Sequence, residues 1–499
     1  MKPLINKNLI PDYVTHVTES LEKAGFEAFL VGGCVRDLLM GGTPKDWDIT
    51  TNANPEQIIP LFEKTIYENT YGTVGVCVPR ETRSEVTQET PEYHIIEVTP
   101  YRIEAKYSDF RHPDQVKYSD NIEDDLKRRD FTMNALAYSI SKGHIIDLYK
   151  GQDDIKDRVV RAVGEAGDRF NEDALRMLRA VRFSTQLDFA IDYETMQAIS
   201  DNASLIKNIS FERIHDEFVK IIESKNPSVG IGMLSKLGLL KHIMPELEEG
   251  IGCDQGGAHI YDVFEHCLQA LEHSANKGFS KEIRLSALFH DIGKPRTRRP
   301  GEKKAYTFYG HEVVGARMTK TIMERLKFPK KETDFVVSMV RNHMFFSDTE
   351  QITLSAVRRM VAKVGKENIW DLMNIRECDR VGMKKVEAPY RLRKYHAMIE
   401  EVLRDPISVG QLAIDGKVLM GELNIKPGPR MGWILNALLE EVLDDPKKNT
   451  KEYLSELVQK LDKLEDKELK ILGESGKEKK ENLEEEEIKK LHAKHGVKK

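Results

Sequence analysis

The stretch FLVGGCVRDLLMGGTPKDWDITT, residues 29–51, contains the pattern that decides the fold of this chain. An apolar run leads into Gly32 and Gly33, a short helical turn follows, and a Gly-Gly-Thr-Pro loop ends that turn. Asp46-Trp47-Asp48 then opens a second β-like run. The pattern predicts a strand, a glycine turn, a helix and a strand, in that order.

The two aspartates of this stretch are candidate metal ligands. Side chains two residues apart in a strand share a face, so Asp46 and Asp48 are expected to point the same way. Mg²⁺ is usually held by one or two carboxylates together with substrate phosphates. The pair on its own is also compatible with ordinary solvated carboxylates, because Asp-x-Asp after a loop is common.

The glycine turn is a candidate phosphate site. Gly32 and Gly33 have no side chains, so a triphosphate can approach their backbone N–H groups and the following helix N-terminus. Arg36 is placed to neutralise phosphate charge, with Asp37 beside it in the same GG-x-x-R-D pattern.

GGCVRDLL followed by PKDWDITT resembles the catalytic signature of the class II tRNA nucleotidyltransferases, which include CCA-adding enzymes and bacterial poly(A) polymerases. The resemblance implies an α+β fold, with a polymerase-β-like head built on a small mixed β-sheet, an all-helical neck and body, and a helical HD domain. It also implies Mg²⁺ on Asp46 and Asp48, with Glu97 as the third acid. Glu97 lies in the apolar run HIIEV, where a lone charge is costly unless it is paired, and an outward-facing edge residue is the alternative.

DDLKRRDFTMNALAY, residues 124–138, resembles the segment that contacts the ribose and phosphates of the incoming nucleotide in this family. The implied nucleotide contacts are Arg129, Asp130 and Asn134. Residues 102–121, which follow the Glu97 strand, are polar and are expected to form no regular element. The resemblance implies that they are the flexible loop of complete CCA-adding enzymes.

EDALRMLRAVRF, residues 172–183, places acids and arginines three and four apart, on one face of a predicted helix. A salt-bridge ladder explains this spacing. A carboxylate and a guanidinium presented together can also bind the Watson–Crick edge of a base. The segment resembles the family's template helix, which implies Asp173 and Arg176 as base readers, with Arg179 and Arg182 near the phosphates or the base.

A second constellation begins near residue 250. A lone histidine on an apolar helix is usually packed in a core, but here six residues follow the H…HD…H…H…D order of HD-domain phosphohydrolases. They are His266, His290, Asp291, His311, His343 and Asp379. Imidazoles and carboxylates suit Ni, Mn, Co, Fe or Zn, and a water bound to such a metal supplies hydroxide for phosphate-ester hydrolysis. We expect phosphomonoesters or 2′,3′-cyclic phosphates as substrates of this second centre.

Length and composition set the outer limits. A chain of 499 residues is too long for one hydrophobic core and predicts about three or four domains. The start of the chain lacks a signal-like apolar segment and no long apolar run occurs, so a cytoplasmic protein without membrane contact is expected. The five cysteines form no C-x-x-C pair, and the net charge of −6 argues against indiscriminate nucleic-acid binding.

The sequence therefore predicts an enzyme that adds CMP, CMP and AMP from CTP and ATP to tRNA, with a hydrolytic HD centre. A poly(A) polymerase or an A-adding enzyme would share nearly every motif, and an HD phosphohydrolase with an RNA-binding head is an alternative of another class. The expected domains are the catalytic head (1–150), the neck with the template helix (151–245), the HD domain (246–400), a C-terminal helical segment (401–463) and a charged tail (464–499).

Overall fold

The computed structural model describes residues 5–67, 72–80, 92–105, 115–256, 259–301, 305–344, 352–382 and 389–474. The chain divides into two compact units, residues 1–245 and 246–499. Each unit has its own hydrophobic core, and each is described by itself.

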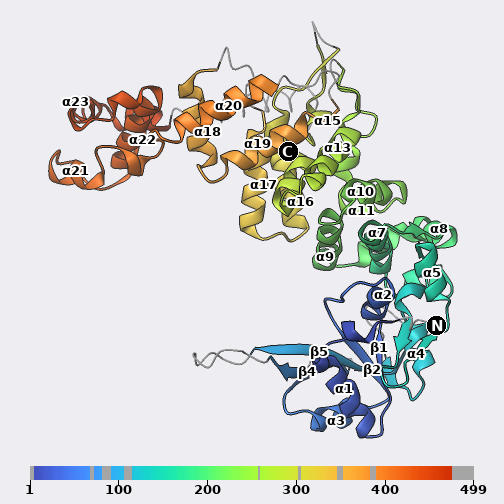
Figure 1. The fold of residues 1–499 in the computed structure, drawn as a ribbon. Coiled ribbons are helices and arrows are strands. Elements are labelled where there is room, and N and C mark those ends of the chain that lie inside the picture. The colour runs from blue at the N-terminus through green and yellow to red at the C-terminus, as the bar shows by residue number, and fades with distance from the viewer. Residues whose placement is uncertain are drawn as a thin grey trace. The chain divides into compact units, whose positions relative to one another are not determined.

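A seven-stranded mixed sheet forms the centre of the first unit (Figure 1). Its spatial order is β3-β4-β5-β2-β1-β8-β9, with β2 and β5 parallel and the other neighbours antiparallel. The strands are β1 (Ala28–Val31), β2 (Asp48–Thr51), β3 (Thr65–Tyr67), β4 (Val74–Pro79), β5 (Tyr93–Pro100), β8 (Leu136–Tyr138) and β9 (Ile145–Asp147). The predicted mixed-sheet head is confirmed.

One face of this sheet is buried against helices. Val14, Val17 and Leu21 of α1 (Asp12–Lys23) pack in one core with Ile96 and Val98 of β5, and all five side chains are at most 1 % exposed. Full burial of such a side chain stabilises the fold by about 1.5–3 kcal/mol. The same core includes residues of α2 (Gly33–Leu39) and α3 (Pro55–Ile58).

The other face is covered over only part of its width. Phe29 and Val31 of β1 and Ala137 of β8 pack there beneath Leu126 of α4 (Ile122–Lys127). On β5, in contrast, Ile95 is 59 % exposed. Asp48 on β2 and Glu97 on β5 lie at the boundary between the covered and the uncovered parts.

A two-stranded sheet corrects one expectation. Residues 102–121 were expected to form no regular element, but β6 (Arg102–Ala105) and β7 (Gln115–Tyr118) pair as antiparallel strands. Backbone hydrogen bonds between strands do not require apolar side chains, which explains why a polar composition concealed the pairing. The centre of the expected flexible loop, residues 106–114, lies outside the described residues.

Helices make up most of the rest of the first unit, together with a short parallel pair of strands, β10 (Val159–Val160) and β11 (Ala190–Ile191). The helices are α5 (Gly151–Asp157), α6 (Ala166–Glu172), α7 (Leu175–Leu187), α8 (Tyr193–Asn202), α9 (Phe211–Ile222), α10 (Pro227–Lys236) and α11 (Leu240–Ile243). The expectation of one helix face for residues 172–182 is wrong, because the backbone is extended at Asp173, between α6 and α7. The Oδ1 atom of Asp173 accepts a hydrogen bond from the N–H of Leu175, the first residue of α7, at 3.1 Å, so this aspartate lies in the turn between the two helices.

The second unit is helical, as expected for an HD domain (Figure 1). Its helices include α13 (Val263–Asn276), α14 (Lys281–Phe289), α15 (Lys294–Thr297), α16 (His311–Arg325), α17 (Lys330–Asn342), α18 (Leu354–Val364), α19 (Ile369–Asp379), α20 (Pro389–Val402), α21 (Gly416–Gly421), α22 (Pro429–Asp444), α23 (Lys451–Leu461) and α24 (Asp466–Glu474). The expected charged tail, residues 464–499, begins just before α24 and includes this helix. Residues 475–499 lie outside the described part. Among the described helices, none is long and apolar enough to cross a membrane.

Candidate functional site

The structure brings two of the three predicted acids of the head side by side. Asp48, the first residue of β2, is the direct partner of Glu97 in the parallel pairing with β5, so both side chains share one face. Glu97 is exposed while its neighbours Ile96 and Val98 are buried. Asp46 lies two residues before Asp48 and is also exposed.

The electrostatics of Asp48 suit a cation. Burial raises the pKa of Asp48 to about 6; the charge of Arg129 opposes this shift, and the charges of Glu97 and Asp46 add to it. Three carboxylates that repel one another, beside a glycine turn without side chains, fit a hard divalent ion such as Mg²⁺.

The glycine turn leaves room for a guanidinium. Gly32 has a φ of +80°, and a Cβ built on it would lie 3.0 Å from Nη1 of Arg129 and 3.9 Å from Oδ2 of Asp48. Any other residue at this position would therefore be strained, and the end of the Arg129 side chain would have to shift. The predicted nucleotide residues Gly32 and Arg129 thus lie directly beside Asp48, one of the predicted catalytic acids.

Asp125, which the sequence analysis did not single out, holds Arg129 in this place. Its side chain is fully buried and accepts hydrogen bonds from Nε and Nη2 of Arg128 at 2.9 and 2.5 Å and from Nη2 of Arg129 at 2.9 Å. Burial opposes ionisation, but the charges of Arg129 and Arg128 outweigh it and keep the pKa of Asp125 below its usual value. An acid three and four residues before two arginines was the available signal.

A chain of hydrogen bonds joins four predicted nucleotide residues. Nη1 of Arg36 donates to Asn134 at 2.9 Å, and Nδ2 of Asn134 donates to Asp130 at 3.1 Å. Arg179 donates to Asp130 from Nε and Nη2 at 2.8 and 2.6 Å. Asp37 accepts from Nε and Nη2 of Arg36 at 2.9 and 2.7 Å, so it orients that arginine.

Three predicted arginines surround one aromatic ring. The guanidinium carbons of Arg36, Arg179 and Arg182 lie 5.2, 5.5 and 4.1 Å from the ring centroid of Phe183. Burial and the neighbouring charge of Arg179 lower the pKa of Arg182 to about 10, although Glu217 accepts a hydrogen bond from it at 3.1 Å. Each of these arginines also pairs with a carboxylate, Arg36 with Asp37, Arg179 with Asp130 and Arg182 with Glu217, so the ring lies within a network of paired charges.

The two predicted base readers are held by protein partners. Arg213 of α9 donates to both carboxyl oxygens of Asp173, at 3.2 and 2.7 Å. Arg176 donates to Glu172 at 2.6 Å and to the backbone carbonyl of Arg128 at 2.8 Å. Arg213 was missed because it lies 40 residues after Asp173 in the chain.

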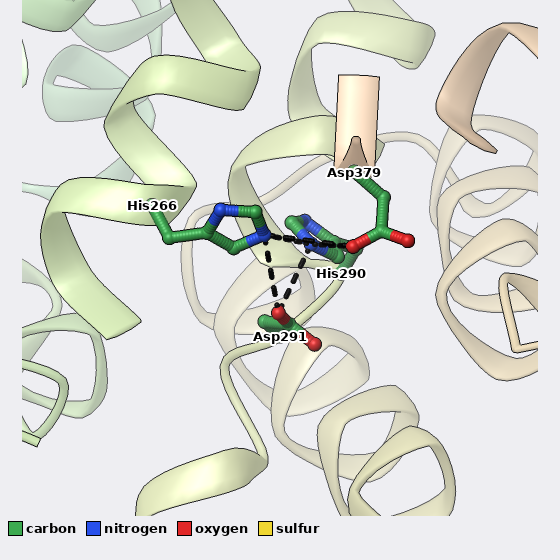
Figure 2. A group of neighbouring side chains, drawn as sticks. All are labelled: His266, His290, Asp291 and Asp379. Atoms are coloured by element: carbon green, nitrogen blue, oxygen red, sulfur yellow. Dashed lines mark hydrogen bonds and ion pairs between the residues drawn. The ribbon is translucent and has the colours of Figure 1, made fainter. Parts of the chain in front are cut away.

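In the second unit, four predicted ligands converge (Figure 2). Nε2 of His266, from α13, lies 3.4 Å from Asp291 and 3.5 Å from Asp379, the last residue of α19. Nε2 of His290 lies 3.2 Å from Asp291 and 3.4 Å from Asp379. The four side chains point toward one another, as ligands of one metal ion do.

The other two predicted ligands form a second group with Asp291. Nε2 of His311 and Nε2 of His343 lie 3.3 and 3.7 Å from the other carboxyl oxygen of Asp291. His290, His311 and His343 each donate from Nδ1 to a backbone carbonyl at 2.7–2.8 Å, which leaves Nε2 of the neutral ring as the ligand atom. Asp291 therefore connects two potential metal positions.

Close backbone packing next to the HD ligands helps to hold them in place. A Cβ built on Gly293 would lie 2.2 Å from the carbonyl oxygen of His311 and 2.6 Å from the N of Gly315. Lys294, also missed in the sequence, approaches Asp291 at 2.5 Å. Burial opposes ionisation of Asp291, but His290 and Lys294 hold the pKa of this carboxyl well below its usual value.

Among the described residues, the two groups of three or more metal-ligating side chains whose donor atoms all lie within 4.8 Å are both in this second centre. The three carboxylates of the head lie further apart than this.

Three families match parts of the chain. Residues 28–161 match the family described as "Poly A polymerase head domain", and residues 188–251 match "Probable RNA and SrmB- binding site of polymerase A". Residues 257–373 match "HD domain". The matches follow the same order as the predicted head, neck and HD segments.

Curated relatives and solved structures extend this likeness over most of the chain. The CCA-adding enzyme of Lactobacillus delbrueckii subsp. bulgaricus is 33 % identical over 452 residues, covering 89 % of this chain and 96 % of that protein. That of Ligilactobacillus salivarius is 33 % identical over 447 residues, covering 89 % and 95 %. The structure of the Bacillus stearothermophilus CCA-adding enzyme in complex with CTP is 27 % identical, with a TM-score of 0.65, and covers 93 % of this chain and 100 % of that chain.

Proposed function

Because this chain belongs to the family of CCA-adding enzymes, we propose that it adds CMP, CMP and AMP from CTP and ATP to the 3′ end of tRNA without a nucleic-acid template. The observation that carries the proposal is the alignment of Asp48 and Glu97 on one face of the head sheet, beside the glycine turn. The 33 % identity to the Lactobacillus delbrueckii CCA-adding enzyme, over 89 % of this chain, supports the same reaction.

Asp46, Asp48 and Glu97 would hold Mg²⁺ in this proposal. Bound there, Mg²⁺ would offset the charge that develops on the α-phosphate during transfer. The N–H of Gly33, at the start of α2, would donate to the triphosphate, whereas the N–H of Gly32 donates to the carbonyl of Leu136 at 3.2 Å. Arg129 lies beside Gly32, close enough to neutralise phosphate charge. The RNA 3′-hydroxyl attacks the α-phosphorus, the bond to the β-phosphate oxygen breaks, and pyrophosphate leaves.

Base selection is assigned to Asp173 and Arg176. A carboxylate accepts from the exocyclic amine that cytosine and adenine share, and a guanidinium donates to ring nitrogens or carbonyls. Arg179 and Arg182 supply positive charge near the phosphates or base, and Asp130 with Asn134 positions Arg179 and Arg36.

The test uses tRNA transcripts that end before CCA, after CC, or in complete CCA, incubated with Mg²⁺, CTP and ATP and then sequenced. Completion to CCA with a halt there is the expected result. Addition of A only would indicate an A-adding enzyme, and long A tails a poly(A) polymerase. Asp48→Ala is expected to abolish all extension.

The HD centre supports a second candidate activity, hydrolysis of phosphomonoesters or 2′,3′-cyclic phosphates. The observation that favours it is the convergence of all six ligands, with Asp291 shared by both groups. The residues fit Ni, Mn, Co, Fe or Zn, and the shared carboxylate suits two ions rather than one. Hydrolysis of 2′,3′-cyclic AMP with each metal tests it, and no turnover with any metal would refute it.

We also propose that the chain consists of five parts, with boundaries near residues 150, 245, 400 and 463. Because the proposed substrate is tRNA, we propose a cytoplasmic location.

A further inference from the structure

The sheet face that carries Asp48 and Glu97 continues beyond them toward the β3 edge. Asp48, Glu97, Gly75 and Ile66 are partners in adjacent strands, so they form one row across the sheet on the same face. Ile66 is 39 % exposed and Ile95, next to Glu97 on this face, is 59 % exposed. The two exposed isoleucines lie together beside the predicted catalytic acids, and exposed apolar patches of this kind often mark a binding site.

The neighbouring half of this face is occupied. Phe29 and Val31 of β1 are buried there beneath α4, whose end carries Arg129. Arg129 lies against Gly32, which follows β1. The nucleotide residues are therefore on the β1 side of Asp48, and Glu97 is on the β5 side.

The geometry of the proposed reaction indicates which ligand lies on the uncovered half of this sheet face. In an in-line displacement, the attacking and leaving oxygens lie on opposite sides of the phosphorus. If the triphosphate lies on the β1 side, pyrophosphate leaves there and the RNA 3′-hydroxyl approaches from the β5 side. The end of the RNA must then lie over β5, β4 and β3.

We propose that Lys64, Ile66, Gly75, Tyr93 and Ile95, here called the acceptor platform, form the surface on which the 3′-terminal nucleotides of the RNA lie. This assignment rests on the proposed transfer reaction and deepens it by naming where the acceptor strand binds.

The chemistry of the acceptor platform changes along the strands in a way that fits single-stranded RNA. Next to Glu97, Ile66 and Ile95 flank Gly75, where a Cβ would lie 3.3 Å from Ile95 and 3.4 Å from the carbonyl of Ile66. The side chains of Ile66 and Ile95 therefore close over Gly75 and form one small apolar surface, on which a ribose and base can lie. About 13 Å further along β5, Nζ of Lys64 lies 4.0 Å from the ring centroid of Tyr93.

Basic and aromatic side chains commonly occur together where proteins bind single-stranded RNA. Aromatic rings stack on bases of any sequence, and cations track the phosphates. The acceptor platform therefore binds the strand without reading its sequence, and reading is left to the residues that contact the incoming base.

The first experiment changes the charge of the acceptor platform with Ile95→Glu and Ile95→Arg. Because the RNA carries phosphates, Ile95→Glu is expected to raise KM for tRNA ending in CC about tenfold while KM for ATP stays within twofold. Ile95→Arg is expected to leave KM for tRNA within threefold. The control is Ile471→Glu on α24, where the isoleucine is 60 % exposed and no effect is expected.

An unchanged KM for tRNA in Ile95→Glu would overturn the proposal. Equal losses in the Glu and Arg variants, together with a change in oligomeric state, would also overturn it and would indicate a protein partner instead.

The second experiment does not depend on catalysis. A tRNA with a photoactivatable 3′-terminal nucleotide is crosslinked to the full-length protein, and the adducts are mapped by mass spectrometry. Adducts within residues 64–66 or 93–97 support the acceptor platform, and adducts confined to other peptides overturn it. If the wild type crosslinks here but extends no RNA, the proposed function fails while the binding surface stands.

Discussion

The carboxylate of Asp130 is 8 % exposed and accepts two hydrogen bonds from Arg179 and one from Asn134. Burial alone would favour the neutral acid, but the arginine charge outweighs it and lowers the pKa of Asp130 to about 2. The free energy of this pairing therefore depends on pH in a predictable direction.

Asp130→Asn is expected to destabilise the first unit by about 2 kcal/mol near pH 6, from the difference between the ordinary pKa and about 2. A lowered folded-state pKa gives stability that is complete above about pH 4 and is lost as the pH falls toward 2. The difference in Tm between wild type and variant, measured at pH 6, 4 and 3, should shrink with the pH. A constant difference would contradict the assignment.

Asp125 offers a test at the same scale. Asp125→Asn removes the charge that holds Arg129, so KM for CTP and ATP is expected to rise about tenfold while KM for tRNA is unchanged. In an Arg129→Ala background the same change should raise KM for CTP and ATP no further, because Asp125 acts on the nucleotide through Arg129, while its hydrogen bonds to Arg128 concern stability. Additive effects would show a general structural role. The control is Glu246→Gln, which removes the ion pair between Glu246 and Arg325 in the other unit and is expected to leave these KM values unchanged.

At the scale of elements, the junction of α6 and α7 is the feature that most concerns base selection. Asp173 belongs to neither helix, and Arg213 of α9 grips both of its carboxyl oxygens. Arg213 therefore acts as a positioning residue for the proposed base reader.

Arg213→Ala is expected to free Asp173 and to lower discrimination between CTP and UTP about tenfold, with a smaller effect on KM for tRNA. Misincorporation is measured by sequencing products made with all four nucleotides. Lys220→Ala, on the same helix, is the control, since Lys220 is about half exposed and lies 3.7 Å from Glu217. Unchanged fidelity in Arg213→Ala would remove Asp173 from base reading.

The same elements show what the sequence could and could not predict. The strands around Gly32 and Asp48, the mixed-sheet head and the helical HD domain followed from local patterns and are confirmed. The break at Asp173 did not follow from the helical spacing of residues 172–182, and the pairing of Asp173 with Arg213 joins residues that are distant in the chain. The β6–β7 pairing was missed because it depends on backbone contacts rather than on composition. Asp125 was missed although its spacing from Arg128 and Arg129 was a local signal. The roles of the site residues stay predictions.

For the whole molecule, the two candidate centres belong to different compact units, residues 1–245 and 246–499. Each unit has its own core and its own set of ligands, so the two chemistries are expected to be separable.

Asp48→Ala is therefore expected to abolish RNA extension and to keep hydrolysis of 2′,3′-cyclic AMP within twofold of wild type. His290→Ala is expected to do the reverse. A transition-metal chelator should remove hydrolysis, and Ni²⁺ or Mn²⁺ should restore it, while extension continues with Mg²⁺. Loss of both activities in either folded variant would show that the centres depend on each other.

The close approach of Gly293 to His311 and Gly315 has a consequence for how the HD centre acquires its metal. Packing of backbone against backbone next to Asp291 holds Gly293 close to the start of α16, which carries His311. We expect such packing to keep the ligands near one another before the metal binds, so that loading requires little ordering of the chain. Which metal is present then depends on the supply of ions in the cell and on ligand softness, and ions can exchange without unfolding.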